Sequence, residues 1–259
     1  MHGHLQGQGA SRGTQPWRGA VESVEPSPNF DSRCLRGNTG WRMINLTLHP
    51  RTTEPLSILC LGSHSDDIEI GCGGTLLRLA EQYPSCTFHW VVFSAIGIRE
   101  AEAKRAADLF VGSKHAREPL LKKFPDGFMP FVGAEVKAVF EELKQTVSPD
   151  LIFTHRSKDA HQDHRLVADL TWNTFRDHFI LEYEIPKYDG DMGRPGVFVP
   201  LEQTVCQTKI QHLMEAFQSQ RSKRWFREDT FLSLMRLRGM ECNAPSGFAE
   251  AFYCRKLVL

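Results

Sequence analysis

Short apolar runs that alternate with amphipathic segments are the feature of this sequence that most restricts its fold. Residues 57–62 (SILCLG) and 87–94 (TFHWVVFS) are rich in the aliphatic, β-branched and aromatic residues typical of buried strands. Over 134–147 the apolar residues instead recur at the i, i+3, i+4, i+7 spacing of a helix. Strands that alternate with helices indicate βαβ units with right-handed crossovers. We therefore expect an α/β fold with a mostly parallel central sheet.

The same patterns predict the remaining elements. Helices are expected at 74–82, 100–110, 134–147, 163–175, 202–218 and 229–239, strands also at 150–154 and 180–184, and an extended apolar run at 248–258. Proline and glycine predict irregular segments at 124–131 and 186–200. Residues 1–42 are rich in Gly, Ser, Pro, Arg and Gln without periodicity, so we expect a disordered leader there and a single domain over 43–259.

Composition argues against several classes of protein. The formal charge is +0, with no basic run, which argues against a nucleic-acid surface. No apolar stretch approaches the roughly 18 residues that span a bilayer, so no membrane span is expected. The seven cysteines are odd in number and form no CxxC pair, which indicates reduced thiols in a cytoplasmic protein. Composition leaves the oligomeric state open.

A cluster of charged and metal-binding residues follows the first predicted strand. His64, Asp66, Asp67 and Glu69 come within eight residues of its end, and glycines at 71–74 then lead into the predicted helix. These glycines lack the GxGxxG spacing and the lysine of a P-loop. We therefore expect a tight turn with close backbone packing there, not a phosphate site.

A second cluster follows the predicted strand at 150–154. His155, Asp159, His161, Asp163 and His164 all lie within ten residues. The carboxyl ends of parallel strands meet at one edge of a sheet, and that is where open α/β proteins place their sites. We therefore expect the two clusters to converge in space.

Together the clusters supply the residue types of a hydrolytic zinc site. Such a site takes three ligands from histidine and carboxylate and leaves a position for water. His64, Asp67 and His164 would make this set for Zn²⁺ or another divalent metal. The neighbouring Asp66 points differently and could act as general base, and His161 could reach a developing oxyanion.

The other polar residues allow simpler explanations. Asp163 or Asp159 could orient an imidazole by accepting its second N–H. Aspartate is also a favoured N-cap, so either one could cap a helix instead. Arg99 and Glu102 follow the second strand, where they could contact substrate or form a salt-bridged helix start. Two clusters at equivalent strand ends are much harder to explain as coincidence than one.

Two motifs resemble a known family. Ser63–Asp67 (SHSDD) resembles the (A/S)HPDD motif of the PIG-L/LmbE-like zinc-dependent N-deacetylases, and 161–164 (HQDH) resembles their HxDH motif. The resemblance covers about residues 56–258. Ser65 stands where the family typically has proline, which would stiffen the turn. The segment 182–188 (EYEIPKY) resembles a bacterial-type branch of the family associated with sugar modification.

The resemblance implies a Rossmann-like three-layer fold and a specific site. It assigns zinc to His64, Asp67 and His164, the general base to Asp66, and carbonyl polarisation to His161; we add Asp163 to the catalytic set. It also implies removal of an N-acetyl group from a GlcNAc-containing small molecule or glycoconjugate, by a zinc-bound water that Asp66 activates.

Several alternatives to this function stay open. A related amidase for a thiol-conjugate or other amide would carry the same motifs, because the leaving amine is bound by loops. A catalytically silent sugar-binding module is the alternative from another class. Divalent-metal phosphotransfer is a third, although its carboxylate-only ligand sets fit poorly with two histidines. We expect the loops at 96–100, 112–131 and 184–200 to shape the pocket for an amino-sugar substrate.

Overall fold

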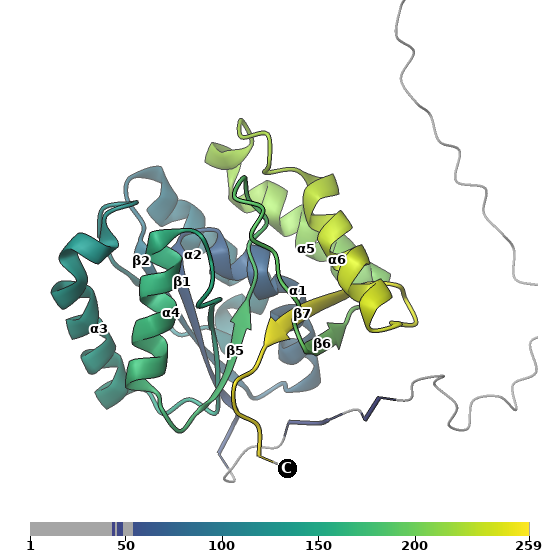
Figure 1. Cartoon of the computed structure of the whole chain (residues 1–259), viewed down its shortest axis with the longest axis horizontal. Coiled ribbons are helices and arrows are strands. Elements are labelled where there is room, and N and C mark those ends of the chain that lie inside the picture. Colours follow the sequence, from purple (N-terminus) through teal and green to yellow (C-terminus); the bar gives the residue numbers. More distant parts are fainter. Residues whose placement is uncertain (1–42, 45, 49–53, 259) are drawn as a thin grey trace, which may run out of the picture. The chain divides into compact units, whose positions relative to one another are not determined.

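A seven-stranded, mostly parallel sheet forms the centre of the structure (Figure 1). The computed structural model describes residues 43, 44, 46–48 and 54–258. Within them the strand order is β3–β2–β1–β4–β5–β7–β6. The strands are β1 (Ser57–His64), β2 (Thr87–Ser94), β3 (Leu120–Leu121), β4 (Leu151–His155), β5 (Phe179–Tyr183), β6 (Val197–Pro200) and β7 (Ala249–Tyr253). Strands β1 to β5 pair in parallel, and β7 runs antiparallel to β5 and β6.

Helices cover both faces of the sheet, as expected for a three-layer fold. They are α1 (Asp67–Gln82), α2 (Ile98–His115), α3 (Gly133–Thr146), α4 (Gln162–Thr174), α5 (Gln203–Ala216) and α6 (Glu228–Glu241), with short 3₁₀ turns η2 (Met129–Val132) and η3 (Gln218–Gln220). Helices α3 and α4 pack together on one face with η2, whereas α1, α2, α5 and α6 contact one another on the other face (Figure 1). The predicted fold class is confirmed.

The central strand β1 contributes to both layers of the core. Ile58 and Cys60 lie in the core cluster that includes side chains of α1 and α2, and Leu59 and Leu61 lie in the cluster with α3 and α4. All four are fully buried. A strand buried on both faces needs apolar residues at every position, which explains the unbroken apolar run that begins the domain.

The order of the strands creates one place suited to a site. The chain goes from β1 to β2 on one side, and later returns to place β4 on the other side of β1. At such a reversal the crossovers lie on opposite faces and leave a crevice at the carboxyl ends of the two strands. His64 ends β1 and His155 ends β4, so both predicted clusters begin at this crevice.

The glycine cluster 71–74 is helical, so the predicted tight turn is wrong. Helix α1 begins at Asp67, seven residues before the predicted start. The predicted close packing is confirmed: a methyl group on Gly71 would lie 2.2 Å from Tyr183 Cδ2, and one on Gly73 would lie 2.4 Å from Phe110 Cε1. Tertiary packing therefore outweighs the low helix propensity of glycine.

Two edge strands fall in the segments 112–131 and 184–200, which are predicted as loops. β3 has two residues and pairs with β2, and β6 lies in the 186–200 segment and pairs with β7. Both are too short to show an alternating pattern in the sequence. The predicted leader at 1–42 lies outside the described residues, all of which belong to the compact unit Arg42–Leu259.

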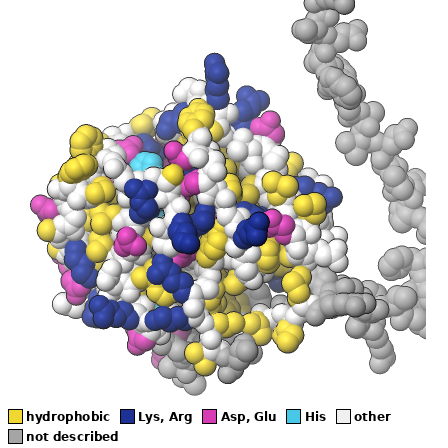
Figure 2. All heavy atoms as spheres, in the orientation of Figure 1, with side chains coloured by type: hydrophobic (Ala, Val, Ile, Leu, Met, Phe, Trp, Pro, Cys, Tyr) yellow, Lys and Arg dark blue, Asp and Glu magenta, His cyan; other side chains and the backbone are white. Residues whose placement is uncertain are grey.

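The described part of the chain holds no helix that is both long and apolar enough to cross a membrane. Its six cysteines are free thiols. On the face drawn in Figure 2, Lys and Arg side chains are scattered among acidic and hydrophobic ones, and a histidine reaches the surface beside acidic side chains.

Candidate functional site

The turn between β1 and α1 presents two aspartates in different directions. The backbone N–H of His64 donates to Asp67 Oδ2 at 2.6 Å, which turns the Asp67 carboxylate back toward the end of β1. Asp66 occupies the N-cap position of α1, but its side chain makes no capping hydrogen bond. It accepts instead from Arg99 Nη2. The side chain of Asp66 therefore does not cap the helix that follows it.

The segment between β4 and α4 brings the second cluster against the first. His161 is the N-cap of α4, and its Nδ1 accepts from the backbone N–H of Asp163 at 3.2 Å. One turn later, His164 Nε2 lies 3.2 Å from His64 Nδ1. The two clusters thus meet at the crevice between β1 and β4, as the parallel topology leads us to expect.

Three side chains present potential ligand atoms at distances that suit one metal ion. His64 Nδ1 lies 3.4 Å from Asp67 Oδ2, and His164 Nε2 lies 3.5 Å from Asp67 Oδ1 and 3.2 Å from His64 Nδ1. A tetrahedral zinc ion with bonds of about 2.0–2.2 Å separates its ligands by about 3.3–3.6 Å. All three residues are buried, at 3–7% exposure. Two imidazoles and a carboxylate in this arrangement fit a divalent metal such as zinc.

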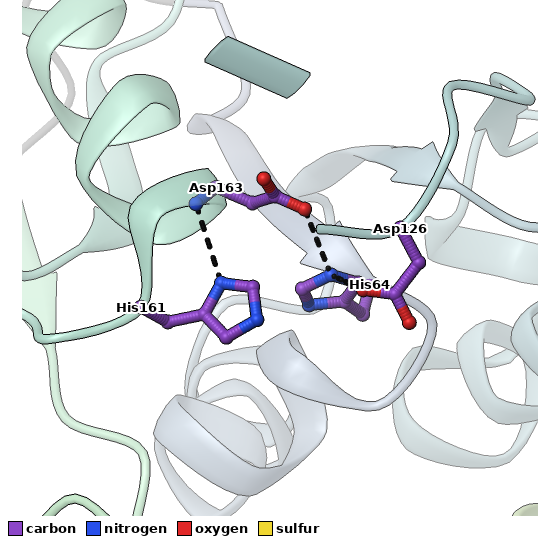
Figure 3. A group of neighbouring side chains, drawn as sticks. All are labelled: His64, Asp126, His161 and Asp163. Carbon is purple, nitrogen blue, oxygen red and sulfur yellow. Dashed lines mark hydrogen bonds and ion pairs between the residues drawn. The ribbon is translucent and has the colours of Figure 1, made fainter. Parts of the chain in front are cut away.

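Each histidine of this set has a carboxylate beside its other ring nitrogen. His164 Nδ1 lies 3.1 Å from Asp159 Oδ2. His64 Nε2 lies 2.9 Å from Asp126 Oδ1 and 3.4 Å from Asp163 Oδ2 (Figure 3). Such outer carboxylates fix the tautomer and orientation of metal-binding histidines.

Asp126 is a site residue that the sequence analysis missed. It lies in the segment after β3, between Pro125 and Gly127, where the sequence indicates only a turn. It comes from a third part of the chain, as Figure 3 shows, and its carboxylate lies beside His64 Nε2 together with that of Asp163. No spacing in the sequence relates it to either motif.

Asp163 connects the second cluster to that same segment. Its Oδ2 accepts from the backbone N–H of Gly127 at 2.7 Å, and its Oδ1 accepts from that of Met129 at 3.2 Å. The residue is fully buried. Its carboxylate therefore holds the loop that carries Asp126 against α4, rather than capping its own helix.

His155 packs against His164 and lies close to Asp67. Its fully buried ring stacks on that of His164, with centroids 3.9 Å apart. Its Nε2 accepts from the backbone N–H of Ser63 at 2.9 Å and lies 3.2 Å from Asp67 Oδ2. His155 thereby ties the end of β4 to the end of β1.

The charges of the site shift the pKa values of His64 and Asp67 in opposite directions. Burial lowers the pKa of His64, but Asp67, Asp126 and Asp163 outweigh burial and hold that pKa well above its usual value. Burial raises the pKa of Asp67, but the nearby histidines, His164 first, outweigh it and hold that pKa well below its usual value. The imidazole of His64 must be neutral to bind a metal, so metal binding at this site would be coupled to proton release.

Two carboxyl groups near the start of α1, Asp66 and Glu69, have raised pKa values. Burial raises the pKa of Asp66, and the guanidinium of Arg99 offsets only part of that effect. Glu69 lies one turn into α1, and burial raises its pKa well above the usual value. Neither carboxylate oxygen of Glu69 has a hydrogen-bond partner among the described residues. Desolvation is thus the main cause of the raised pKa of both neighbouring carboxyl groups.

Of the two residues predicted to contact substrate, the structure brings only Arg99 to the cluster. Glu102 is buried one turn further along α2, where its carboxylate accepts from the backbone N–H of Ser219 at 2.8 Å and from its hydroxyl at 2.7 Å. These contacts fasten α2 to η3. A role for Glu102 in substrate binding stays a prediction.

Comparison with known proteins agrees with the fold and the motifs. Residues 59–175 match the model of the PIG-L family, described as GlcNAc-PI de-N-acetylase. N,N′-diacetylchitobiose deacetylase from Pyrococcus horikoshii is similar in structure, with a TM-score of 0.59 and 18% identity over 76% of this chain and 83% of that one. A conserved protein from Thermus thermophilus gives a TM-score of 0.63 and 21% identity, over 79% and 96% of the two chains.

A further neighbour has a different activity. The 4-carboxy-2-hydroxymuconate hydratase from Pseudomonas putida gives a TM-score of 0.58 and 17% identity, over 79% of this chain and 98% of that one. At such identities the similarity establishes the fold and not the reaction. The family match is independent of these neighbours and includes both histidine clusters. The chain therefore carries a PIG-L family domain over residues 59–175.

Proposed function

We propose that the protein is a metal-dependent hydrolase that removes an N-acetyl group from a GlcNAc-containing small molecule or glycoconjugate. The observation that carries the proposal is a set of three side chains, His64, Asp67 and His164, whose potential ligand atoms lie 3.2–3.5 Å from one another. This set lies beside an aspartate that does not cap its helix. The description of the matched family as a de-N-acetylase supports the choice of reaction.

His64, Asp67 and His164 would hold the metal, which we infer to be Zn²⁺, although other divalent ions share this ligand preference. When bound, the ion would act as a Lewis acid toward the acyl oxygen and lower the pKa of a water molecule toward neutrality.

Asp66 would act as the general base and then as the general acid. Its carboxylate would accept a proton as water attacks the acetamide carbonyl carbon, and would return that proton to the amine nitrogen as the C–N bond breaks. The products are acetate and a free amine. A carboxylate with a raised pKa suits both steps, and Arg99 holds one of its oxygens in place.

His161 would stabilise the oxyanion as a neutral donor. Its Nδ1 accepts a hydrogen bond from the Asp163 backbone, which places the ring proton on Nε2. Burial and the nearby His164 and His64 lower the pKa of His161, which favours this neutral form. An Nε2–H of this neutral ring can donate to the carbonyl oxygen without an additional charge.

Three carboxylates would keep the histidines in position. Asp159 would orient His164, and Asp126 and Asp163 would orient His64. On this proposal Asp163 contributes to catalysis by positioning and not by contact with substrate. The free thiols of the described cysteines support the further inference that the protein works in the reducing cytoplasm.

An acetate-release assay would test the proposal. Purified protein loaded with zinc is incubated with free, nucleotide-linked, lipid-linked and inositol-linked N-acetylglucosamine, and acetate and free amine are both measured. We expect equal amounts of the two products with at least one of these substrates. A thiol-conjugate amide is tested in parallel, and release of amine without acetate from it would favour the related amidase. Binding of a substrate without release of either product would favour a silent sugar-binding module.

A test variant and a control variant carry the same Asp→Asn change at two different positions. Asp66→Asn should retain metal but lower turnover by roughly 10²-fold or more, because it removes the general base. Asp108→Asn, at an exposed position on α2, should leave turnover unchanged. Full metal-dependent deacetylation by Asp66→Asn would refute the assigned role.

A further inference from the structure

We propose that Lys187 is a positioning residue for this site, because its ammonium group holds Asp159 against the two histidines of the second cluster. Lys187 lies in the segment between β5 and β6, far in sequence from both motifs. The inference rests on the metal site proposed above and concerns how firmly that site is preorganised.

One carboxylate connects Lys187 to both histidines. Lys187 Nζ lies 3.0 Å from Asp159 Oδ1. Asp159 Oδ1 also accepts from the backbone N–H of His161 at 2.7 Å, while its Oδ2 lies 3.1 Å from His164 Nδ1. A shift of this carboxylate would therefore disturb the proposed oxyanion donor and a metal ligand together.

A second carboxylate completes the arrangement. Lys187 Nζ donates to both oxygens of Asp191, each at 2.8 Å. Asp191 Oδ2 in turn accepts from the backbone N–H of Ala160 at 2.6 Å. The ammonium group thus sits between two carboxylates that each hold the segment just before α4. The β5–β6 segment thus contacts the segment before α4 through the side chains of Lys187 and Asp191.

Burial makes these contacts strong enough to matter. The side chain of Lys187 is 10% exposed and that of Asp159 is 3% exposed, so solvent and salt screen their attraction weakly. Without the ammonium group, only the backbone N–H groups and the His164 imidazole that these carboxylates contact would offset the repulsion between Asp159 and Asp191. A turn of either carboxylate away from the other would loosen the segment that carries the histidines.

The direction in which loss of the Lys187 ammonium changes metal affinity distinguishes a positioning role from a purely electrostatic one. Removal of a positive charge near a cation site, taken alone, should tighten metal binding by Coulomb attraction. Loss of positioning should weaken it, by about tenfold if it resembles other losses of outer contacts around a metal. The two explanations therefore predict opposite signs for Lys187→Met.

The experiment measures the dissociation constant for Zn²⁺ by competition with a chelator and the visible spectrum of the Co²⁺-loaded protein. Lys187→Met should weaken zinc binding about tenfold and alter the Co²⁺ spectrum. Lys158→Met, an exposed lysine in the turn that precedes Asp159, is the matched control and should change neither. Lys187→Arg keeps the charge and should recover most of the affinity.

A double-mutant cycle identifies the route of the effect. If Lys187 acts through Asp159, then Lys187→Met should weaken zinc binding little further in an Asp159→Asn background. Unchanged or tighter zinc binding by folded Lys187→Met, or additive effects in the cycle, would overturn the proposal. Thermal unfolding of the metal-free proteins checks the fold, and Lys187→Gln takes the place of Lys187→Met if that variant does not fold.

The same assay distinguishes this inference from the proposed metal site. His164→Ala should abolish stoichiometric zinc binding in the otherwise unchanged chain. Retention of zinc by His164→Ala would count against the site itself, whereas its loss together with an unaffected Lys187→Met would count against Lys187 alone.

Discussion

Replacement of Gly71 by alanine tests how tightly α1 is pressed onto the sheet beneath the site. The added methyl group would lie 2.2, 2.5 and 2.9 Å from three carbon atoms of the Tyr183 ring. Carbon atoms in good contact are about 3.5–4.0 Å apart, so the ring or the helix would have to move by about 1 Å. The Tyr183 side chain is fully buried and its hydroxyl donates to the Leu61 carbonyl at 2.7 Å, so the ring has little freedom to move.

The expected loss of stability follows from these contacts. Overpacking a buried site costs about 1–3 kcal/mol, and loss of the Tyr183 hydrogen bond with its buried acceptor adds about 1–3 kcal/mol. The better helix propensity of alanine returns about 1 kcal/mol. We therefore expect Gly71→Ala to lower the free energy of unfolding by about 3 kcal/mol.

Urea unfolding of the metal-free protein measures this change as a lower midpoint at an unchanged slope. Gly133→Ala is the matched control, because Gly133 begins α3 and a methyl group there would meet nothing within 4 Å. It should be neutral or stabilising by up to about 1 kcal/mol. If the two variants agreed within about 0.5 kcal/mol, the reasoning about close packing would be refuted. Combination with Tyr183→Leu should relieve part of the Gly71→Ala cost.

Three further predictions address the metal, a buried ion pair and acid stability. His164→Ala should reduce metal in the purified protein well below one ion per chain, and unchanged metal content would exclude His164 as a ligand. Glu250→Ala should cost about 3–5 kcal/mol in urea unfolding, because it leaves the ammonium of Lys209, 2.6 Å from Glu250, buried without a counter-charge. Burial raises the pKa of Asp191, but Lys187 outweighs burial and holds that pKa below its usual value, so its stabilisation is present above about pH 4 and is lost as the pH falls below that value. The stability difference between wild type and Asp191→Asn should accordingly shrink toward pH 2, and a constant difference would contradict the assignment.

The sequence alone predicted the α/β fold with its parallel sheet and the three side chains that meet at the centre of the candidate site. An apolar run such as that of β1 can be stable only between two covered faces, so it predicts a parallel sheet directly. His64, Asp67 and His164 stand next to strand ends that the same pattern locates. Local spacing and one topological rule were therefore sufficient to expect that they meet.

Only the tertiary structure decided how the site is supported. Asp126 and Lys187 come from loops after β3 and β5, where no periodicity relates them to the histidines they influence. Glu102 lies close to Arg99 in sequence, yet its contacts with Ser219 direct it to η3. Such side chains come close to the site only in the folded chain. The conformation of their loops depends on contacts with the rest of the chain, which local sequence patterns do not reveal.

The glycine cluster shows the same division within one helix. The sequence indicates that the backbone at 71–74 must approach something closely, because glycine is the residue that permits it. It does not say what lies opposite. For Gly71 that partner is Tyr183, which comes from β5 more than a hundred residues later and packs against α1 because β4 and β5 assemble beside β1. The absence of a side chain on glycine indicates that something packs closely there, and the order of the strands determines that Tyr183 packs against Gly71.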